Sequence, residues 1–84
     1  RNRDGQEVDA VLESSDGRLV GIEVKAASAV RSEDFRHLEH LQRLAGDRFE
    51  HGVVLYTGSE RFAFGDRLTA LPISGLWAEE KGRK

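Results

Sequence analysis

The 84 residues suffice for one small domain, and their formal net charge of −2 excludes a broadly basic surface for binding nucleic acid. The absence of cysteine excludes disulfides and thiolate metal sites, which fits a cytoplasmic protein. No apolar run approaches the roughly 20 residues of a membrane helix, so we expect no membrane partner. The chain begins at Arg1 rather than methionine. We therefore expect the carboxy-terminal piece of a longer protein, with one domain over residues 1–78 and a charged flexible tail over residues 79–84.

Two short apolar segments separated by a turn signal come first. Residues 7–13 (EVDAVLE) alternate between polar and apolar side chains, as a half-buried strand does. Asp16-Gly17 supplies the residue with positive φ that a tight hairpin turn needs. Residues 19–25 (LVGIEVK) then form the return strand. The turn predicts that the two strands pair antiparallel.

These two strands carry charged residues at a spacing of two. Glu7 and Asp9 lie on the first strand, and Glu23 and Lys25 lie on the second. Residues two positions apart on a strand project from the same face, so the hairpin would bring Asp9 and Glu23 together near one end. Carboxylates that converge beside a lysine would form a metal site. The alternative is a salt bridge between Glu23 and Lys25 on a solvated sheet face, where such pairs contribute little stability.

A helix is predicted over residues 33–45. Ser32 suits its N-cap, and Gly46 suits the position just after its end. His37 and His40 are three positions apart on its remaining sides. They would lie on a solvated helix face, with a metal-binding pair as the alternative. The apolar stripe at helical spacing consists of Phe35, Leu38, Leu41, Leu44 and Ala45.

The remaining segments complete a mixed α/β pattern. Residues 47–51 are predicted to be a polar loop, and residues 52–56 (GVVLY) a buried strand parallel to an earlier one, because a helix precedes them. Residues 57–67 would form a short irregular hairpin or loop. Residues 68–73 would form a last extended segment, in which Pro72 marks a strand end or an edge.

The elements together predict a small mixed β-sheet of three to five strands, made of an antiparallel hairpin plus a crossover strand, with one main helix packed on it. Trp77 would serve as a core anchor rather than as a platform for a ligand. The chain has no Gly-x-x-x-x-Gly-Lys-Ser/Thr sequence, so we expect no P-loop nucleotide site in it.

The order of these motifs carries a resemblance. Gly5-x-Glu7-Val8-Asp9, a hairpin, and then Ile22-Glu23-Val24-Lys25 are similar to the core of the PD-(D/E)xK nuclease superfamily. More narrowly, the chain resembles the carboxy-terminal nuclease-like domain that follows the AAA+ module in a large group of prokaryotic ATPases of poorly known function. The matching stretches are residues 5–9, 22–25, 28–41, 52–58 and 70–77.

The resemblance implies a truncated restriction-endonuclease-like core with a metal site. Asp9 and Glu23 would bind Mg²⁺ or Mn²⁺, with the carbonyl of Val24 as a third ligand. Lys25 would complete the catalytic set with the two acids. Hard oxygen ligands of this kind suit both ions, which activate water for phosphodiester cleavage.

Four further residues are assigned accessory roles. Glu7 would either add a ligand or flank the site, and Gln42 on the helix would either reach the site or remain solvated. Arg3 and Arg31 would contact nucleic acid.

Two functions are therefore expected. The first is a Mg²⁺-dependent nuclease domain that acts on DNA, with RNA as the alternative substrate and an AAA+ module of the same parent chain as its partner. The second is a non-catalytic module that docks nucleic acid or a protein partner, or regulates the ATPase. Composition favours no particular oligomeric state.

Overall fold

An antiparallel hairpin forms the first part of the fold. The computed structural model describes residues 8–74, so the predicted strand residue Glu7 lies outside the described part. Strand β1 (Ala10–Glu13) pairs antiparallel with β2 (Leu19–Val24), and Ala10 lies opposite Ile22. Gly17 has a φ of 89° in the connecting turn, a conformation that costs glycine little. The predicted hairpin is confirmed.

The helical layer begins differently from the prediction. A 3₁₀ turn, η1 (Ser32–Phe35), leads directly into α1 (Arg36–Ala45). Ser32 was expected to be the N-cap, but the N-cap is Arg31. The side chain of Asp34 accepts a hydrogen bond of 2.7 Å from the backbone N–H of Arg31. The acid at the third helical position therefore satisfies the backbone N–H of the N-cap residue itself, which is one half of a capping box.

The connection from α1 to the central strand is shorter than expected. Gly46 ends α1 with a φ of 59°, as predicted, and opens a second 3₁₀ turn, η2 (Gly46–Arg48). Strand β3 (Phe49–Tyr56) follows at once. The predicted polar loop over residues 47–51 is wrong, because Phe49 is fully buried and begins the strand inside that polar stretch.

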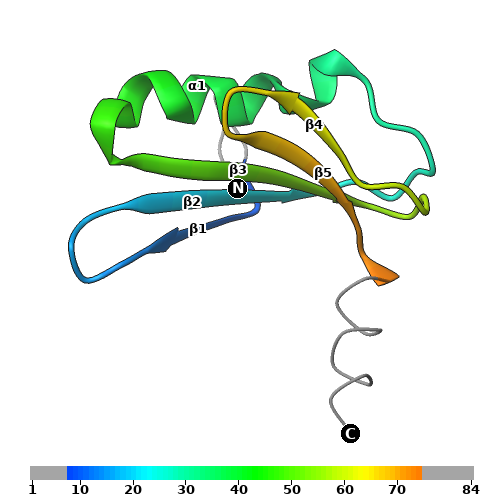
Figure 1. Ribbon diagram of the computed structural model, residues 1–84, viewed down its shortest axis with the longest axis horizontal. Helices are drawn as coiled ribbons and strands as arrows, with labels where there is room; N and C mark the ends of the chain where they lie inside the picture. The colour runs from blue at the N-terminus through cyan, green and yellow to red at the C-terminus, as the bar shows by residue number, and fades with distance from the viewer. Residues whose placement is uncertain (1–7, 75–84) are drawn as a thin grey trace, which may run out of the picture.

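All five strands form one sheet in the order β1-β2-β3-β5-β4, with β4 (Phe62–Gly65) and β5 (Leu68–Pro72) completing it (Figure 1). β2, β3 and β5 run parallel, which confirms the predicted crossover strand. β4 pairs antiparallel with β5, so residues 57–67 do contain a short hairpin strand. Pro72 is the last residue of β5, a position at a strand end that proline tolerates.

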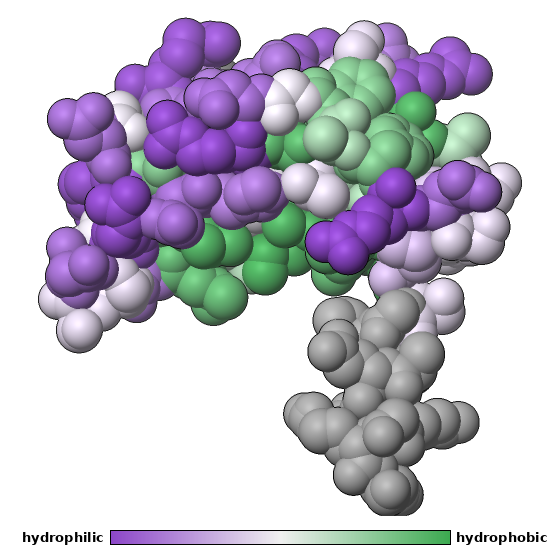
Figure 2. All heavy atoms as spheres, in the orientation of Figure 1, coloured by the Kyte–Doolittle hydropathy of each residue, from purple (hydrophilic) through white to green (hydrophobic). Residues whose placement is uncertain are grey.

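The core lies between α1 and the face of the sheet that α1 covers. Phe35 and Leu38 from the helical layer are fully buried, and the Phe35 ring stacks on Phe64 with centroids 4.5 Å apart. The buried sheet residues are Phe49, Val54, Tyr56, Leu68 and Ala70. Apolar residues also gather on the lower side of the molecule in Figure 2, away from α1. Trp77 and residues 79–84 lie outside the described residues.

Leu38→Ala should lower the free energy of unfolding by about 2–5 kcal/mol, because it opens a cavity under the helix. Leu44→Ala on the same helix is the matched control. Its side chain is 72% exposed, and we expect a change within about 0.5 kcal/mol. Urea unfolding followed by circular dichroism measures both. Equal effects of the two substitutions would contradict the assignment of the core.

Candidate functional site

The side of β2 that faces the helix carries a glycine and then two charged residues. A Cβ atom added to Gly21 would lie 2.8 Å from Cδ2 of Leu38 and equally close to Cδ2 of Leu41, so α1 packs directly on this strand. Because alternate residues share a face, Glu23 and Lys25 also point toward the helical layer. They therefore lie under η1 and the start of α1, rather than on a solvated face.

Asp9 lies beside these two residues on the neighbouring chain segment. The β1–β2 pairing ends with Ala10 opposite Ile22, and Asp9 comes directly before Ala10 in the chain. Oδ2 of Asp9 accepts a hydrogen bond of 2.7 Å from the backbone N–H of Val24. The N–H and C=O of one extended residue point to the same side, so the Val24 carbonyl also faces Asp9. The structure thus places the carboxylate of Asp9 against the backbone of Val24, next to Glu23 in the chain.

Glu23 is a carboxylate with one oxygen left unpaired. Its Oε2 lies 3.2 Å from Nδ1 of His37, whereas its Oε1 is buried and has no hydrogen-bond partner within residues 8–74. Burial raises the pKa of Glu23 above its ordinary value; the hydrogen bond and charge of His37 oppose this rise, while Asp9 and Asp34 add to it. A buried, unsatisfied carboxylate oxygen is costly unless a proton or a cation meets it.

Lys25 is bound by Asp34 rather than by Glu23. Its Nζ donates to Oδ2 of Asp34, and both side chains are partly buried. Burial alone would raise the pKa of Asp34, but the hydrogen bonds from Lys25 and from the Arg31 amide outweigh it and hold that pKa below its usual value. The alternative of an exposed Glu23–Lys25 salt bridge is therefore wrong in its pairing and in its location.

The other predicted site residues are not brought to these carboxylates. The side-chain amide of Gln42 donates to the carbonyl of Asp66, at 3.2 Å, in the turn between β4 and β5. Arg31 is exposed at the start of η1, one turn from Asp34. Glu7 and Arg3 lie outside the described residues. Within residues 8–74, no three His, Cys, Asp or Glu side chains cluster in a way that could hold a metal ion.

Asp34 and His37 are the partners of Lys25 and Glu23 on the helical layer, and the sequence analysis did not identify these pairs. His37 was expected to be solvated, yet its side chain is only 23% exposed and contacts Glu23. Both residues share a helix face with the apolar stripe. Asp34 lies four residues before Leu38, and His37 lies four residues before Leu41. Polar residues on the sheet-facing stripe, opposite a charged strand, were the signal that could have identified them.

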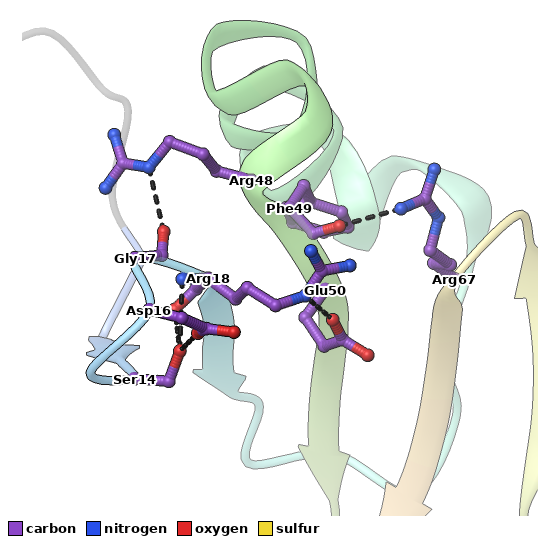
Figure 3. A network of polar contacts seen from close by, with 8 residues as sticks. All are labelled: Ser14, Asp16, Gly17, Arg18, Arg48, Phe49, Glu50 and Arg67. Carbon is purple, nitrogen blue, oxygen red and sulfur yellow. Dashed lines mark hydrogen bonds and ion pairs between the residues drawn. The ribbon is translucent and has the colours of Figure 1, made fainter.

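Charged residues at the far end of the hairpin have structural partners instead (Figure 3). Arg18 pairs with Glu50, and Nε of Arg48 donates to the carbonyl of Gly17 at 2.8 Å. Nη1 of Arg67 donates to the carbonyl of Phe49 at 2.7 Å. These contacts tie the hairpin turn and β5 to β3. The acids and the lysine near the carboxyl end of β2 lie away from these contacts.

The model of a domain of unknown function, DUF4143, matches residues 1–76. The chain belongs to the DUF4143 family. No curated protein and no solved structure matches it. In the described part of this DUF4143 domain, no helix is long and apolar enough to cross a membrane.

The groups at the carboxyl end of β2 suit the binding of a hard cation. Asp9, Glu23 and the Val24 carbonyl present hard oxygen atoms at one end of the hairpin, which suits a cation such as Mg²⁺ or Mn²⁺ better than a soft metal. Lys25 adds a positive charge on the same face of β2. The carboxyl end of β2 in this DUF4143 domain therefore carries carboxylate oxygens and an ammonium group close together.

Asp34→Asn should lower the free energy of unfolding by about 1–3 kcal/mol at pH 7, because Lys25 loses its partly buried, charged partner. The pKa of Asp34 is lowered by folding, so its stabilisation is present above its unfolded pKa, near 3.8, and is lost as the pH falls through the folded value. The difference between wild type and variant should therefore shrink below about pH 4.

Glu33→Gln is the matched control, since it removes an exposed acid from the same turn and leaves the Lys25–Asp34 pair intact. We expect it to change the free energy of unfolding by no more than about 0.5 kcal/mol. Urea titrations at a series of pH values measure all three proteins. A difference between wild type and Asp34→Asn that stays constant from pH 7 to about pH 3 would show that the pair does not depend on the charge of Asp34.

Proposed function

We propose that this domain is a PD-(D/E)xK nuclease-like module with a divalent-metal site for phosphodiester chemistry on DNA. It would form the carboxy-terminal part of a chain that also carries an AAA+ ATPase module. The observation that supports this most strongly is Oε1 of Glu23, which is buried and has no hydrogen-bond partner among residues 8–74, with Asp9 bound to the amide of the next residue, Val24. Such an atom is expected where a cation binds.

The donor set fits Mg²⁺ or Mn²⁺. Asp9 and Glu23 would hold the ion through their carboxylates, and the Val24 carbonyl would be a third ligand. Mg²⁺ keeps several of its waters and needs only one or two protein carboxylates, so two acids are enough. When bound, the ion would supply a water with a lowered pKa and would offset negative charge on a phosphate.

Lys25 has the role of a phosphate partner in this proposal. Its ammonium group lies on the same face of β2 as Glu23 and is held there by Asp34. Because Asp34 also caps η1, the pair fixes the lysine on a rigid element rather than on a loop. Arg31 beside the pair, together with Arg3, would attract the DNA backbone.

A second function is supported by the same pairs. Glu23 contacts His37 and Lys25 contacts Asp34, so both charged residues of β2 already have partners on the helical layer. In a non-catalytic module these pairs would act as links between sheet and helix. The domain would then dock nucleic acid or a protein, or regulate the ATPase, without cleaving a bond.

A titration of Mn²⁺ into ¹⁵N-labelled protein distinguishes the two functions. For a metal site we expect paramagnetic broadening of backbone amides around Asp9 and residues 23–25, lost in Asp9→Asn. Glu13→Gln on the same strand is the matched control, because its exposed carboxylate pairs with Arg48 at the other end of the hairpin. It should leave the broadening unchanged.

The same three proteins are then tested for Mn²⁺-dependent cleavage of DNA. Asp9→Asn should reduce the rate by roughly 100-fold or more, since even second-shell changes at metal sites cost 10–100-fold. Broadening without cleavage in any of the three would favour the docking module. Broadening that is absent, or equal in Asp9→Asn and wild type, would exclude the metal site.

A further inference from the structure

One histidine of the helix contacts the carboxylate that is proposed as a metal ligand. Nδ1 of His37 lies 3.2 Å from Oε2 of Glu23. An ionised carboxylate can only accept hydrogen bonds, so the proton of this contact belongs to Nδ1. The other oxygen of Glu23, Oε1, is buried and has no hydrogen-bond partner within residues 8–74. The contact with His37 therefore occupies one oxygen of the carboxylate and leaves the second one over.

The packing of α1 fixes the position of this histidine. His37 is the second residue of α1, and its side chain is only 23% exposed. The next residue, Leu38, is fully buried in the core. Leu41, one turn further along, approaches Gly21 so closely that a Cβ atom there would lie 2.8 Å from its Cδ2. Because these leucines set the rotation of the helix above β2, the His37 imidazole is held by the core rather than by a loop.

A carboxylate that binds a metal ion benefits from such a contact. A glutamate side chain has many rotamers, and a hydrogen bond to one oxygen limits the positions that the other oxygen can take. Partners of this kind orient metal ligands, and their removal typically costs about 10–100-fold in affinity. Asp9 has an equivalent contact, because its Oδ2 accepts the backbone N–H of Val24 at 2.7 Å. Each of the two acids is therefore bound by the protein through one of its oxygens.

We propose that His37 is a positioning residue of the metal site, and that its Nδ1–H holds Oε2 of Glu23 so that Oε1 is presented to the divalent cation. This inference rests on the metal site proposed above and adds the helix to it. Mg²⁺ and Mn²⁺ prefer oxygen ligands, so the imidazole acts through the carboxylate and is not itself a ligand. The helix then orders a ligand that lies on the sheet.

Two substitutions at His37 separate a positioning role from a structural one. His37→Ala removes the donor and keeps a residue that favours helix formation. His37→Asn restores a donor, because the amide nitrogen of asparagine is separated from Cβ by one carbon, as Nδ1 of histidine is. We expect the Mn²⁺ dissociation constant to rise about 10–100-fold in His37→Ala and to return close to the wild-type value in His37→Asn. If His37 only supported the fold, both folded variants would bind Mn²⁺ like the wild type.

His40→Ala is the matched control. His40 lies three residues further along α1 and makes no ion pair with an acid in the part of the chain that the structure describes. Its substitution should leave the dissociation constant unchanged. The affinities come from paramagnetic broadening during the Mn²⁺ titration, and the backbone amide spectrum of each metal-free protein verifies its fold.

The results separate the role of His37 from the metal site itself. A wild type that binds no Mn²⁺ would remove the metal site and the role of His37 with it. A wild type that binds Mn²⁺, with equal affinity in His37→Ala, would leave the metal site in place and overturn the role of His37. Weak binding in His37→Asn as well would also overturn it, because the amide should replace Nδ1 as the donor.

A measurement on the wild type alone tests the same contact and does not depend on the folding of a variant. A long-range ¹H–¹⁵N spectrum at about pH 8, where a free imidazole is neutral, shows which ring nitrogen of His37 carries a proton. We expect a proton on Nδ1 both without metal and at saturating Mg²⁺. The absence of a proton from Nδ1 in either state would overturn the proposal.

Discussion

The packing of α1 on the glycine, glutamate and lysine of β2 is the constraint on which the rest of the structure depends. Gly21 has no side chain, so leucines of the helix reach the strand backbone there. Two residues further on, Glu23 meets the helix, and after another two Lys25 meets η1. Two residues along a strand advance about 6.6 Å, and three to four residues along a helix advance about 5 Å. Successive helix-facing residues of β2 therefore meet successive turns of the helical layer. The helical partners in order are Leu41 and Leu38, then His37, then Asp34.

This constraint places charge inside a domain that has little stability to spare. A chain of this size buries a small core, and an unsatisfied buried polar group costs about 1–3 kcal/mol. Within residues 8–74, Oε1 of Glu23 is such a group, and burial raises the pKa of Glu23. An apolar residue at this position would pack against the helix without that cost. Local rules are broken in this way mostly at sites that serve a function, which is why we regard the carboxyl end of β2 as the site.

The sequence was sufficient for elements whose signals are local. Turn chemistry at Asp16-Gly17 predicted the hairpin, and the apolar run before Tyr56 predicted the parallel crossover strand. The early start of β3 was missed because Phe49 stands alone among polar residues, and only tertiary packing shows that it is buried. The partners of Glu23 and Lys25 were missed for a related reason. The alternation of residues along a strand predicts which side chains share a face. Which helix residues lie above that face depends on how the helix is rotated, and the packing of the whole core sets this rotation.

The central claim is that Asp9 and Glu23 hold one divalent cation at the end of the hairpin. A crystal of the protein soaked in Mn²⁺, with diffraction recorded for anomalous scattering, tests it most directly. The account predicts one anomalous peak within about 2.0–2.6 Å of both carboxylates and of the Val24 carbonyl. Anomalous peaks confined to exposed surface acids, with Glu23 still paired only with His37, would contradict it.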